Sequence, residues 1–207
     1  MDRLRLGIFA SGRGSNFSAI LQAIDEERLD ADVRVLVSNS REAGALDVAK
    51  QWGIPAEVIS STDFPDRPRF VQAFLDLLER HGVEFIALAG YLKKMPPEVI
   101  VRYPNRILNI HPALLPAFGG KGMYGHFVHE AVLEQGCKVT GVTVHLVDER
   151  YDGGPIVLQR CVPVLERDTA EILAARVLET EHAVFPEALQ WFARGRVRVE
   201  GRRVIIE

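Results

Sequence analysis

The chain opens with Leu4-Arg-Leu-Gly-Ile-Phe-Ala10, continues as Ser11-Gly-Arg-Gly-Ser-Asn16, and then reads Phe17-Ser-Ala-Ile-Leu-Gln-Ala-Ile24. The first run is short and apolar, which is typical of a buried strand, whereas the third has apolar residues at helical spacing. A strand, a glycine-rich turn and a helix in this order form the repeating unit of an α/β protein. The opening stretch therefore predicts an α/β fold.

The same alternation of strand and helix continues through the first half of the chain. Strands are expected at 32–38, 56–59, 85–89 and 107–111, and helices at 43–52, at 66–80 and from Pro96 or Pro97. Short connections between such units favour a doubly wound, mostly parallel sheet, in which ligands bind beyond the carboxyl ends of the strands. We expect His111, the turn after the first strand, and Tyr91 with Leu92 at that edge.

The second half predicts further helices and strands and a terminal hairpin. Helices are expected at 126–135 and 169–180, with a second helical piece after Glu181-His182 through Trp191. Strands are expected at 139–147 and 156–162, and a C-terminal hairpin at 197–206 around Gly201. The glycine-rich stretch 117–125 is expected to be mobile. Because no repeat, low-complexity segment or linker interrupts the 207 residues, we expect a single domain, 1–207.

The composition fits a globular protein and excludes some classes of partner. Hydrophobic residues make up 47% of the chain and charged residues 26%, with a net charge of -3. A chain without a basic surplus is a poor candidate for binding nucleic acid. The first apolar run ends at Ser11, too early for a signal peptide, and no stretch is long enough to cross a membrane. Cys137 and Cys161 lack metal-ligand spacing, which favours free thiols in a reducing cytoplasm.

The turn after the first strand can bind an anion, because a helix N-terminus presents free N–H groups and the positive end of its dipole. Gly12 and Gly14 allow close backbone approach, and Ser15 and Asn16 can either cap the helix or donate to a phosphate. Phe17 breaks the dinucleotide fingerprint, and no Walker lysine follows. Two interpretations stay open: a phosphomonoester site, or a plain strand–helix turn with a serine cap.

Strand 107–111 carries two polar side chains on one face. Side chains alternate along a strand, so Asn109 and His111 point the same way, roughly 6.6 Å apart. A buried, unpaired amide costs about 1–3 kcal/mol, so Asn109 needs a partner or a ligand. A carboxylate, Asp152, stands before two glycines after strand 139–147. Taken separately, the polar pair could bond a loop and cap a turn, and Asp152 could belong to an ordinary Asp-Gly turn.

Together the three residues suit acyl transfer to an amine, because that reaction forms a tetrahedral oxyanion and moves a proton. The Asn109 amide can donate to the oxyanion, a contact typically worth about 10²–10³-fold in rate. A carboxylate at Asp152 would favour the protonated form of His111, which could then donate and relay the proton. No serine or cysteine stands in a nucleophile motif, so we expect direct transfer without an acyl-enzyme.

One expected helix carries histidine and acid close together. His126, His129 and Glu130 fall within 126–135, but the two histidines at i,i+3 have no third ligand nearby in the sequence. We interpret the three as part of a surface helix and expect no metal.

The motifs Asn109-Ile-His111-Pro-x-Leu-Leu-Pro116 and Asp152-Gly-Gly-Pro155, in this order, resemble those of the folate-dependent formyltransferase family. The turn Gly14-Ser15-Asn16 narrows the resemblance to the members that formylate glycinamide ribonucleotide in purine biosynthesis. The resemblance spans residues 4–191 and implies a Rossmann-like formyltransferase fold. It also implies direct formyl transfer from a co-substrate, 10-formyltetrahydrofolate, to the substrate amine, which gives formylglycinamide ribonucleotide and tetrahydrofolate.

The resemblance further implies a role for each matching residue. Asn109, His111 and Asp152 would be catalytic, with Asp152 raising the pKa of His111. Thr143 and His145 would support them. The phosphate of glycinamide ribonucleotide would lie on Gly14, Ser15 and Asn16, and its ribose hydroxyls on Glu181. The folate-binding residues would be Arg67, Leu92, Lys93, Lys94, Met95, Asn109, Asp148, Glu149, Arg150, Tyr151 and Asp152.

The expected partners are therefore small molecules, and we expect a cytoplasmic monomer or homodimer that binds neither nucleic acid nor membrane. Three alternatives stay open. Family members that act on methionyl-tRNA would add a C-terminal domain and a basic surface, and those that hydrolyse the formyl donor would add an N-terminal regulatory domain. A non-catalytic phosphosugar-binding module of the same fold would have no need of the polar trio.

Overall fold

The computed structural model describes residues 3–207. Within them, seven strands pair in the order β3-β2-β1-β4-β5-β6-β7, and two more form a separate hairpin sheet, β8-β9. The predicted α/β fold with a mostly parallel sheet and a terminal hairpin is confirmed. The chain divides into two compact units between Leu108 and Asn109. The single domain expected from the sequence remains a prediction, which one shared unfolding transition would test.

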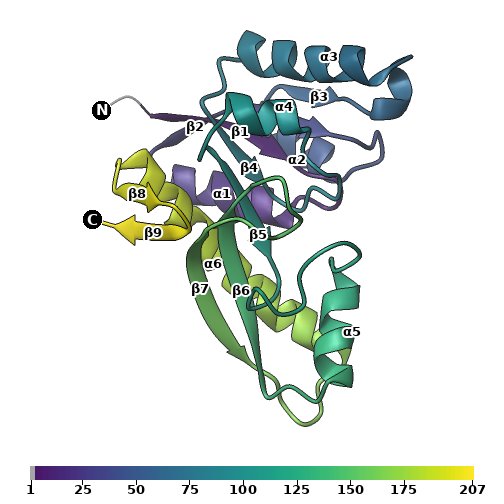
Figure 1. Ribbon diagram of the computed structural model, residues 1–207, viewed down its shortest axis with the longest axis vertical. Coiled ribbons are helices and arrows are strands. Elements are labelled where there is room, and N and C mark those ends of the chain that lie inside the picture. Colours follow the sequence, from purple (N-terminus) through teal and green to yellow (C-terminus); the bar gives the residue numbers. More distant parts are fainter. Residues whose placement is uncertain (1–2) are drawn as a thin grey trace. The chain divides into compact units, whose positions relative to one another are not determined.

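The N-terminal unit is built from alternating strands and helices (Figure 1). Its strands are β1 (Leu4–Phe9), β2 (Ala31–Ser38), β3 (Ala56–Val58) and β4 (Phe85–Leu88), and their pairings are parallel. Its helices are α1 (Ser15–Asp25), α2 (Ala45–Gln51), the short 3-10 helix η1 (Ser61–Asp63), α3 (Arg67–Arg80) and α4 (Pro97–Arg102). Because β1 lies between β2 and β4, the strand order reverses at β1, and the turn after β1 occupies the position where such sheets bind ligands.

Helix α3 shows how the sequence determines an element of this unit. Asp66 caps its N-terminus, since the carboxylate accepts the N–H of Arg69 at 2.8 Å. Apolar residues at helical spacing form the buried face of the helix. One of them, Phe74, stacks on Phe9 of β1 with ring centroids 5.2 Å apart. The helix therefore packs on the sheet beside the turn that follows β1.

Strand β5 (Ile107–His111) contains the boundary between the units. The C-terminal unit continues with α5 (His126–Glu134), β6 (Val139–Leu146), β7 (Ile156–Pro163), α6 (Ala170–Ala193), β8 (Val197–Glu200) and β9 (Arg203–Ile206). Strands β6 and β7 are antiparallel; β6 is buried from Thr140 onward, whereas β7 is largely exposed, as an outer strand is. The hairpin turns at Gly201, which has a left-handed φ of 58°.

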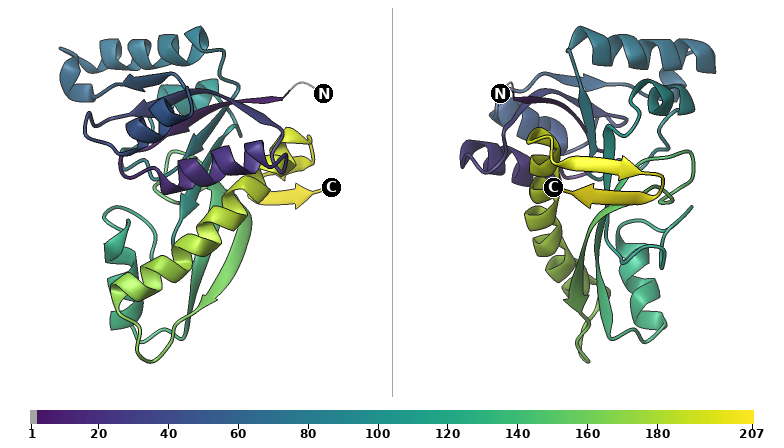
Figure 2. Two further views of the ribbon diagram at one scale, coloured as in Figure 1. Left: turned by 180° about the vertical axis from the view of Figure 1, so that it is seen from behind. Right: turned by 60° about the vertical axis from the view of Figure 1, so that its left-hand side comes forward.

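Helix α6 has 24 residues, and Figure 2 shows that it is unbroken. The predicted interruption at residues 181–182 is wrong. Pro186 lies inside the helix and has no N–H to donate to the carbonyl of His182, a loss that usually costs about 3 kcal/mol. An apolar face that includes Leu173, Val184 and Leu189 is fully or almost fully buried along the whole helix, and this burial outweighs the missing bond. Among residues 3–207, no helix is both long and apolar enough to cross a bilayer.

Candidate active site

Four polar side chains of the C-terminal unit form a cluster. Nδ2 of Asn109 lies 3.0 Å from Nε2 of His145, which in turn lies 3.7 Å from Oδ1 of Asp152. The other carboxylate oxygen, Oδ2, lies 3.7 Å from Nδ1 of His111. Both imidazoles are almost completely buried. The structure thus brings Asn109, His111 and Asp152 together around His145, and their catalytic roles remain predictions.

His145 fixes the orientation of the Asn109 amide. The Leu146 carbonyl can only accept, so Nδ1 of His145, 2.8 Å away, carries the proton and donates it. Nδ2 of Asn109 is a donor, and its N–H is directed at Nε2, the other nitrogen of the ring. An amide nitrogen has two hydrogens in one plane. Because the first N–H of Asn109 points at His145, the direction of the second N–H is fixed as well.

His111 is held by a backbone carbonyl. Its Nε2–H donates to the carbonyl oxygen of Phe118 at 2.8 Å, which leaves Nδ1 as the nitrogen that faces Asp152. Burial lowers the pKa of His111 below its ordinary value; the Asp152 carboxylate acts in the opposite direction but does not compensate. Asp152 thus raises the pKa of His111, as the resemblance implies, but burial of the ring lowers the pKa by more, so the net shift is downward. The role of His111 in proton transfer remains a prediction.

Asp152 itself remains ionised. Burial raises the pKa of its carboxyl, but polar contact with the His145 ring, the N–H of Gly120 and the nearby His111 together lower the pKa below its ordinary value. Asp152 has a left-handed φ of 49°, which aspartate tolerates better than most residues. Gly154 follows two residues later, where a Cβ would collide with the Leu146 carbonyl oxygen. The loop therefore needs glycine at 154 to aim the carboxylate inward.

Thr143 supports the turn that follows β5. Its hydroxyl donates to the Ala113 carbonyl at 2.6 Å and accepts the N–H of Leu115 at 3.0 Å. A second support, not expected from the sequence, is Gln159 on β7, whose amide donates to the Leu115 carbonyl at 2.9 Å and to Thr143 Oγ1 at 3.0 Å. Adjacent antiparallel strands thus brace the backbone just beyond His111.

Residues 118–120 are also part of the site. Besides the Phe118 carbonyl, the N–H of Gly120 donates to Oδ2 of Asp152 at 2.9 Å. From the sequence, this glycine-rich stretch was expected to be mobile and was assigned no contacts. Both contacts are made by backbone atoms, so no side-chain motif could have revealed them.

The turn after β1 presents the N-terminus of α1. Gly14 is the N-cap residue, with a left-handed φ of 82°, and a Cβ there would lie 2.7 Å from Cα of Ala45. Glycine has no capping side chain, so the serine cap, one of the two interpretations left open by the sequence, is not found: Ser15 and Asn16 are the first two residues of the helix itself. Their backbone N–H groups point out of the first turn, as an anion site requires.

Ser11 connects this turn to the segment after β4. Its hydroxyl donates to Oδ1 of Asn39 at 2.5 Å and accepts the N–H of Leu92 at 2.8 Å. Of the predicted folate-binding residues in this segment, Leu92, Lys93 and Lys94 are exposed, whereas Met95 is 2% exposed and belongs to the core. Met95 can therefore shape the segment from beneath.

The other predicted binding residues differ in their surroundings. Arg67, the first residue of α3, forms a bidentate pair with Glu98 at 2.7 and 2.8 Å on the exposed surface. In the loop before Asp152, Arg150 pairs with Asp148 at 3.2 Å, and Glu149 and Tyr151 are exposed. Glu181 is buried within α6.

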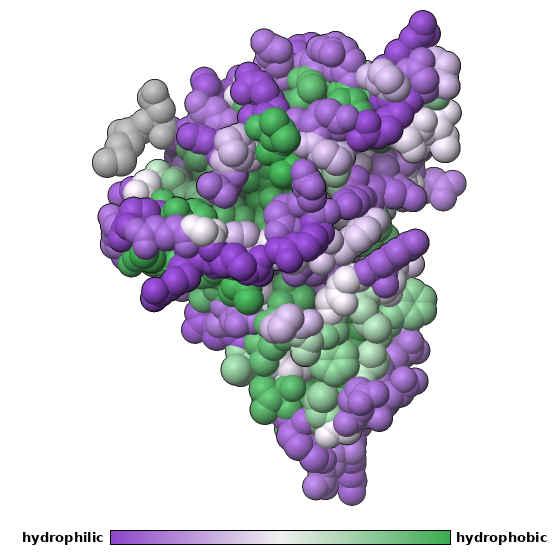
Figure 3. Space-filling view, viewed as in Figure 1, coloured by the Kyte–Doolittle hydropathy of each residue, from purple (hydrophilic) through white to green (hydrophobic). Residues whose placement is uncertain are grey.

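Helix α5 differs from the expected surface helix in one residue. His126 and Glu130 are half-exposed and pair at 3.0 Å, but His129 is 4% exposed, and burial lowers its pKa to about 4. On the face seen in Figure 3, the region of α5 is largely hydrophobic. Phe127 of α5 is exposed and packs edge to face against Tyr124. Residues 3–207 contain no group of three or more His, Cys, Asp or Glu side chains placed to hold a metal ion.

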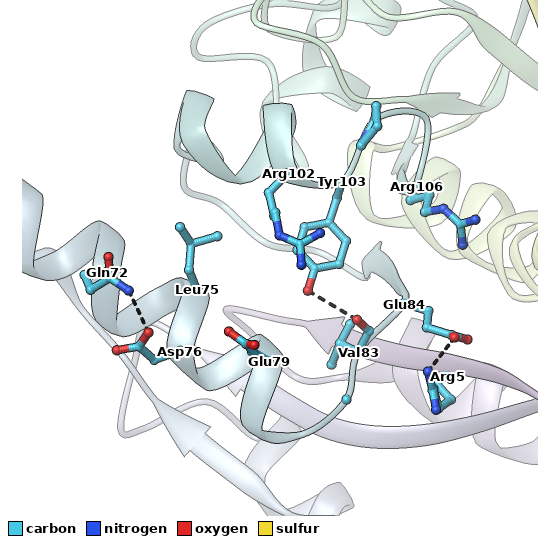
Figure 4. A pocket seen from close by; sticks show the side chains of 12 residues that line it. Arg5, Gln72, Leu75, Asp76, Glu79, Val83, Glu84, Arg102, Tyr103 and Arg106 are labelled. Atoms are coloured by element: carbon cyan, nitrogen blue, oxygen red, sulfur yellow. Dashed lines mark hydrogen bonds and ion pairs between the residues drawn. The ribbon is translucent and has the colours of Figure 1, made fainter.

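A cavity of about 520 Å³ lies within the N-terminal unit, at the amino ends of β1 and β4 (Figure 4). Its lining includes three arginines and three acids: Arg5, Arg102, Arg106, Asp76, Glu79 and Glu84. Arg5 and Glu84 pair with each other at 2.5 Å, and the Tyr103 hydroxyl donates to the Val83 carbonyl. None of the predicted site residues lines this cavity, which lies at the other end of β1 from the turn 11–16.

An amide donor, a buried imidazole and a carboxylate within one cluster of an α/β protein suit a group-transfer enzyme, because an amide can stabilise an oxyanion and an imidazole can relay a proton. The comparison with known proteins agrees. The chain belongs to the Formyl transferase family, whose profile matches residues 4–189. Within that family it groups with the phosphoribosylglycinamide formyltransferases.

Three relatives support this grouping. The chloroplastic phosphoribosylglycinamide formyltransferase of Arabidopsis thaliana is 44% identical over 197 residues, covering 95% of this chain and 68% of that protein. The Bacillus subtilis enzyme of the same name is 37% identical over 186 residues, which are 90% of this chain and 93% of that enzyme. The crystal structure of glycinamide ribonucleotide transformylase 1 from Symbiobacterium toebii superposes with a TM-score of 0.93 at 42% identity, covering 99% and 94%.

Some relatives are longer than this chain. It spans 62% of a Vigna unguiculata relative and 19% of a trifunctional purine biosynthetic protein of Bos taurus.

Proposed function

We propose that the protein transfers the formyl group of 10-formyltetrahydrofolate to the amine of glycinamide ribonucleotide in de novo purine biosynthesis. The amine nitrogen attacks the formyl carbon, a tetrahedral intermediate forms, and the bond from that carbon to N10 of the folate breaks. The products are formylglycinamide ribonucleotide and tetrahydrofolate. The partners are small molecules, no metal takes part, and the reaction takes place in the cytoplasm.

The observation that carries the proposal is the oriented amide of Asn109. One N–H is directed at Nε2 of His145 at 3.0 Å, so the amide is held before substrate arrives. A preorganised donor stabilises the oxyanion without reorganising during the reaction, and its loss typically costs about 10²–10³-fold in rate. His145 thus makes Asn109 a fixed donor.

His111 and Asp152 supply the proton transfer. His111 has a lowered pKa and is neutral near neutral pH, so it can take the proton that the attacking amine must lose. The resulting imidazolium is stabilised by the Asp152 carboxylate, 3.7 Å away. The same proton is then delivered to the departing folate nitrogen. One proton leaves the nucleophile and one reaches the leaving group, so the step balances without water or metal.

The N-terminus of α1 suits the phosphate of the acceptor. Gly14 brings the backbone close, and the N–H groups of Ser15 and Asn16 lie in the first helical turn. Glu181 is assigned to the ribose hydroxyls. The exposed residues at 92–94 and the loop 148–152 are assigned to the formyl donor, with Arg67 and Met95 as further donor-binding residues.

The proposal is tested by mixing purified protein with both substrates and following the release of tetrahydrofolate. We expect turnover that requires glycinamide ribonucleotide and is unchanged by a chelator. His111→Ala and Asp152→Asn should lose most of the rate while still binding the ribonucleotide in calorimetry.

Two outcomes would contradict the proposal. Ribonucleotide binding without turnover, at high protein concentration, would identify a phosphosugar-binding module. Release of formate without glycinamide ribonucleotide would identify a hydrolase of the formyl donor.

A further inference from the structure

Two hydrogen bonds of the catalytic cluster come from one three-residue segment, residues 118–120. The Phe118 carbonyl accepts from Nε2–H of His111, and the N–H of Gly120 donates to Oδ2 of Asp152. The segment therefore contacts both members of the proton-transfer pair with its backbone alone.

The Phe118 contact selects the tautomer of His111. A carbonyl oxygen cannot donate, so the proton of the neutral ring lies on Nε2, and Nδ1 has the lone pair. Nδ1 is the nitrogen that faces Oδ2 of Asp152 at 3.7 Å. The nitrogen that can take a proton is thus the one beside the carboxylate that stabilises it.

The Gly120 contact selects one oxygen of Asp152. Oδ2 accepts the N–H of Gly120 at 2.9 Å and is also the oxygen nearest His111, whereas Oδ1 faces His145 at 3.7 Å. A carboxylate rotates about its terminal torsion unless both oxygens are occupied. The backbone N–H therefore fixes which oxygen faces which ring.

The backbone of the segment has a conformation that few residues adopt. Phe118 has a left-handed φ of 53° although it is not glycine, and Gly120 has a φ of 100°. Gly119 lies so close to Leu115 and Asp152 that a Cβ there would meet the Leu115 side chain and would lie 3.3 Å from Cβ of Asp152. Such conformations persist where the surroundings determine them, and they concentrate at functional sites.

The backbone three residues before this segment is attached to the sheet. The Leu115 backbone is held by Thr143 on β6 and by Gln159 on β7 through bonds of 3.0 and 2.9 Å. Support from strands is more precise than support from a free loop.

We infer that the backbone of residues 118–120 is a positioning element for formyl transfer: it sets the tautomer of His111 and the rotation of Asp152. This inference rests on the proposed function for its effect on rate. Phe118 and Gly120 are positioning residues and do not contact the reacting atoms.

Gly120→Ala and Gly122→Ala are a matched pair that tests the inference. Both glycines have left-handed φ values, 100° and 92°, and neither has an atom within 4 Å of an added Cβ. An alanine is strained at either position, but only at 120 does the shift displace the N–H that binds Asp152. We expect kcat to fall about 10²-fold in Gly120→Ala, the usual cost of misplacing a catalytic group by about 1 Å, and to stay near the wild-type value in Gly122→Ala. KM for both substrates should stay within about twofold in both variants.

Two further measurements separate positioning from general structural damage. Displacing the Gly120 N–H should move the acid limb of the rate profile to lower pH, because a misplaced Asp152 carboxylate gives the His111 imidazolium less support. Nitrogen NMR of the His111 ring should show the Nε2–H tautomer in the wild type and in Gly122→Ala.

Phe118→Val and Phe118→Asn provide a second comparison that does not depend on position 120. A β-branched valine resists a φ of 53°, whereas asparagine adopts it readily. We expect valine to mix the His111 tautomers and asparagine to preserve the Nε2–H form.

Equal kcat in the two glycine variants would overturn the inference, as would a fall in kcat with an unchanged pH profile and tautomer. The tautomer is measured without substrate. A wild-type protein with the Nε2–H tautomer but no formyl transfer would therefore refute the proposed function and leave the positioning intact.

Discussion

Nδ2 of Asn109 donates to Nε2 of His145 across 3.0 Å, and His145 can accept because its own proton is donated to the Leu146 carbonyl. Replacing His145 by Phe keeps a flat ring and removes the acceptor. We expect kcat to fall about 10²-fold, since the amide would lose its fixed direction. His145→Gln, whose carbonyl oxygen can accept, should recover part of the loss. Steady-state kinetics will decide, and a wild-type kcat in the phenylalanine variant would refute the role assigned to His145.

His111 should titrate below the ordinary histidine pKa of 6.5, because burial disfavours its charged form. Activity that depends on the neutral ring should therefore be retained as the pH falls to 6.5 and be lost only at lower pH. In Asp152→Asn the supporting charge is absent, so the midpoint should move lower still. NMR titration of the His111 ring measures both values, and a midpoint above 6.5 in the wild type would contradict this account.

His129 should make the protein sensitive to acid. Its pKa is lowered from 6.5 to about 4 by burial, and its Nδ1 has no partner among residues 3–207. As the pH falls from 6.5 towards 4, the unfolded chain takes up a proton that the folded chain does not, so stability is lost in that window. The shift corresponds to at most about 3 kcal/mol.

Urea unfolding of the wild type and of His129→Leu at pH 7 and pH 4.5 will test this prediction. The leucine variant should lose less stability between the two values, whereas His126→Ala, at a half-exposed position one turn earlier, should behave like the wild type. Equal losses in the wild type and the leucine variant would disprove the prediction.

Gly14 and Gly12 should differ sharply in their tolerance of alanine. At Gly14 the φ is 82° and the added Cβ would lie 2.7 Å from Cα of Ala45, whereas at Gly12 nothing lies within 4 Å. We expect Gly14→Ala to cost about 2 kcal/mol or more and Gly12→Ala to be within about 0.5 kcal/mol of the wild type. Thermal unfolding compares them, and equal stability would show that α1 and α2 are not packed through this glycine.

Much of the fold could be predicted from the sequence because the spacing of apolar residues and the residues that begin or end an element indicate the same helices and strands. The run at 4–10 is apolar enough to be a buried strand, and Asp66 marks the start of α3 as a cap. Helix α6 was predicted wrongly at residues 181–182, because the polar pair there was taken as a boundary. The buried face of that helix continues past them to Leu189 and depends on tertiary packing, which a local pattern does not contain.

The part of the candidate site that is made of side chains could be predicted. Asn109, His111 and Asp152 could be selected by residue type and spacing, and His145 by its place on a strand face. The contacts at Phe118 and Gly120 could not, since every residue has the same carbonyl and every residue except proline the same N–H. The direction in which the pKa of His111 shifts depends on two opposing effects, burial of the ring and the Asp152 charge 3.7 Å away. Neither the burial nor the distance can be read from a linear sequence.

The hydrogen bond from His111 to Phe118 has a consequence for the charge of the site during the reaction. Nε2 already carries a hydrogen, so a proton taken from the attacking amine enters the ring at Nδ1, 3.7 Å from Oδ2 of the ionised Asp152. The imidazolium and the carboxylate then form a pair with no net charge until the proton passes to the departing nitrogen. In a low-dielectric interior such a compensated pair is disfavoured less than a single charge.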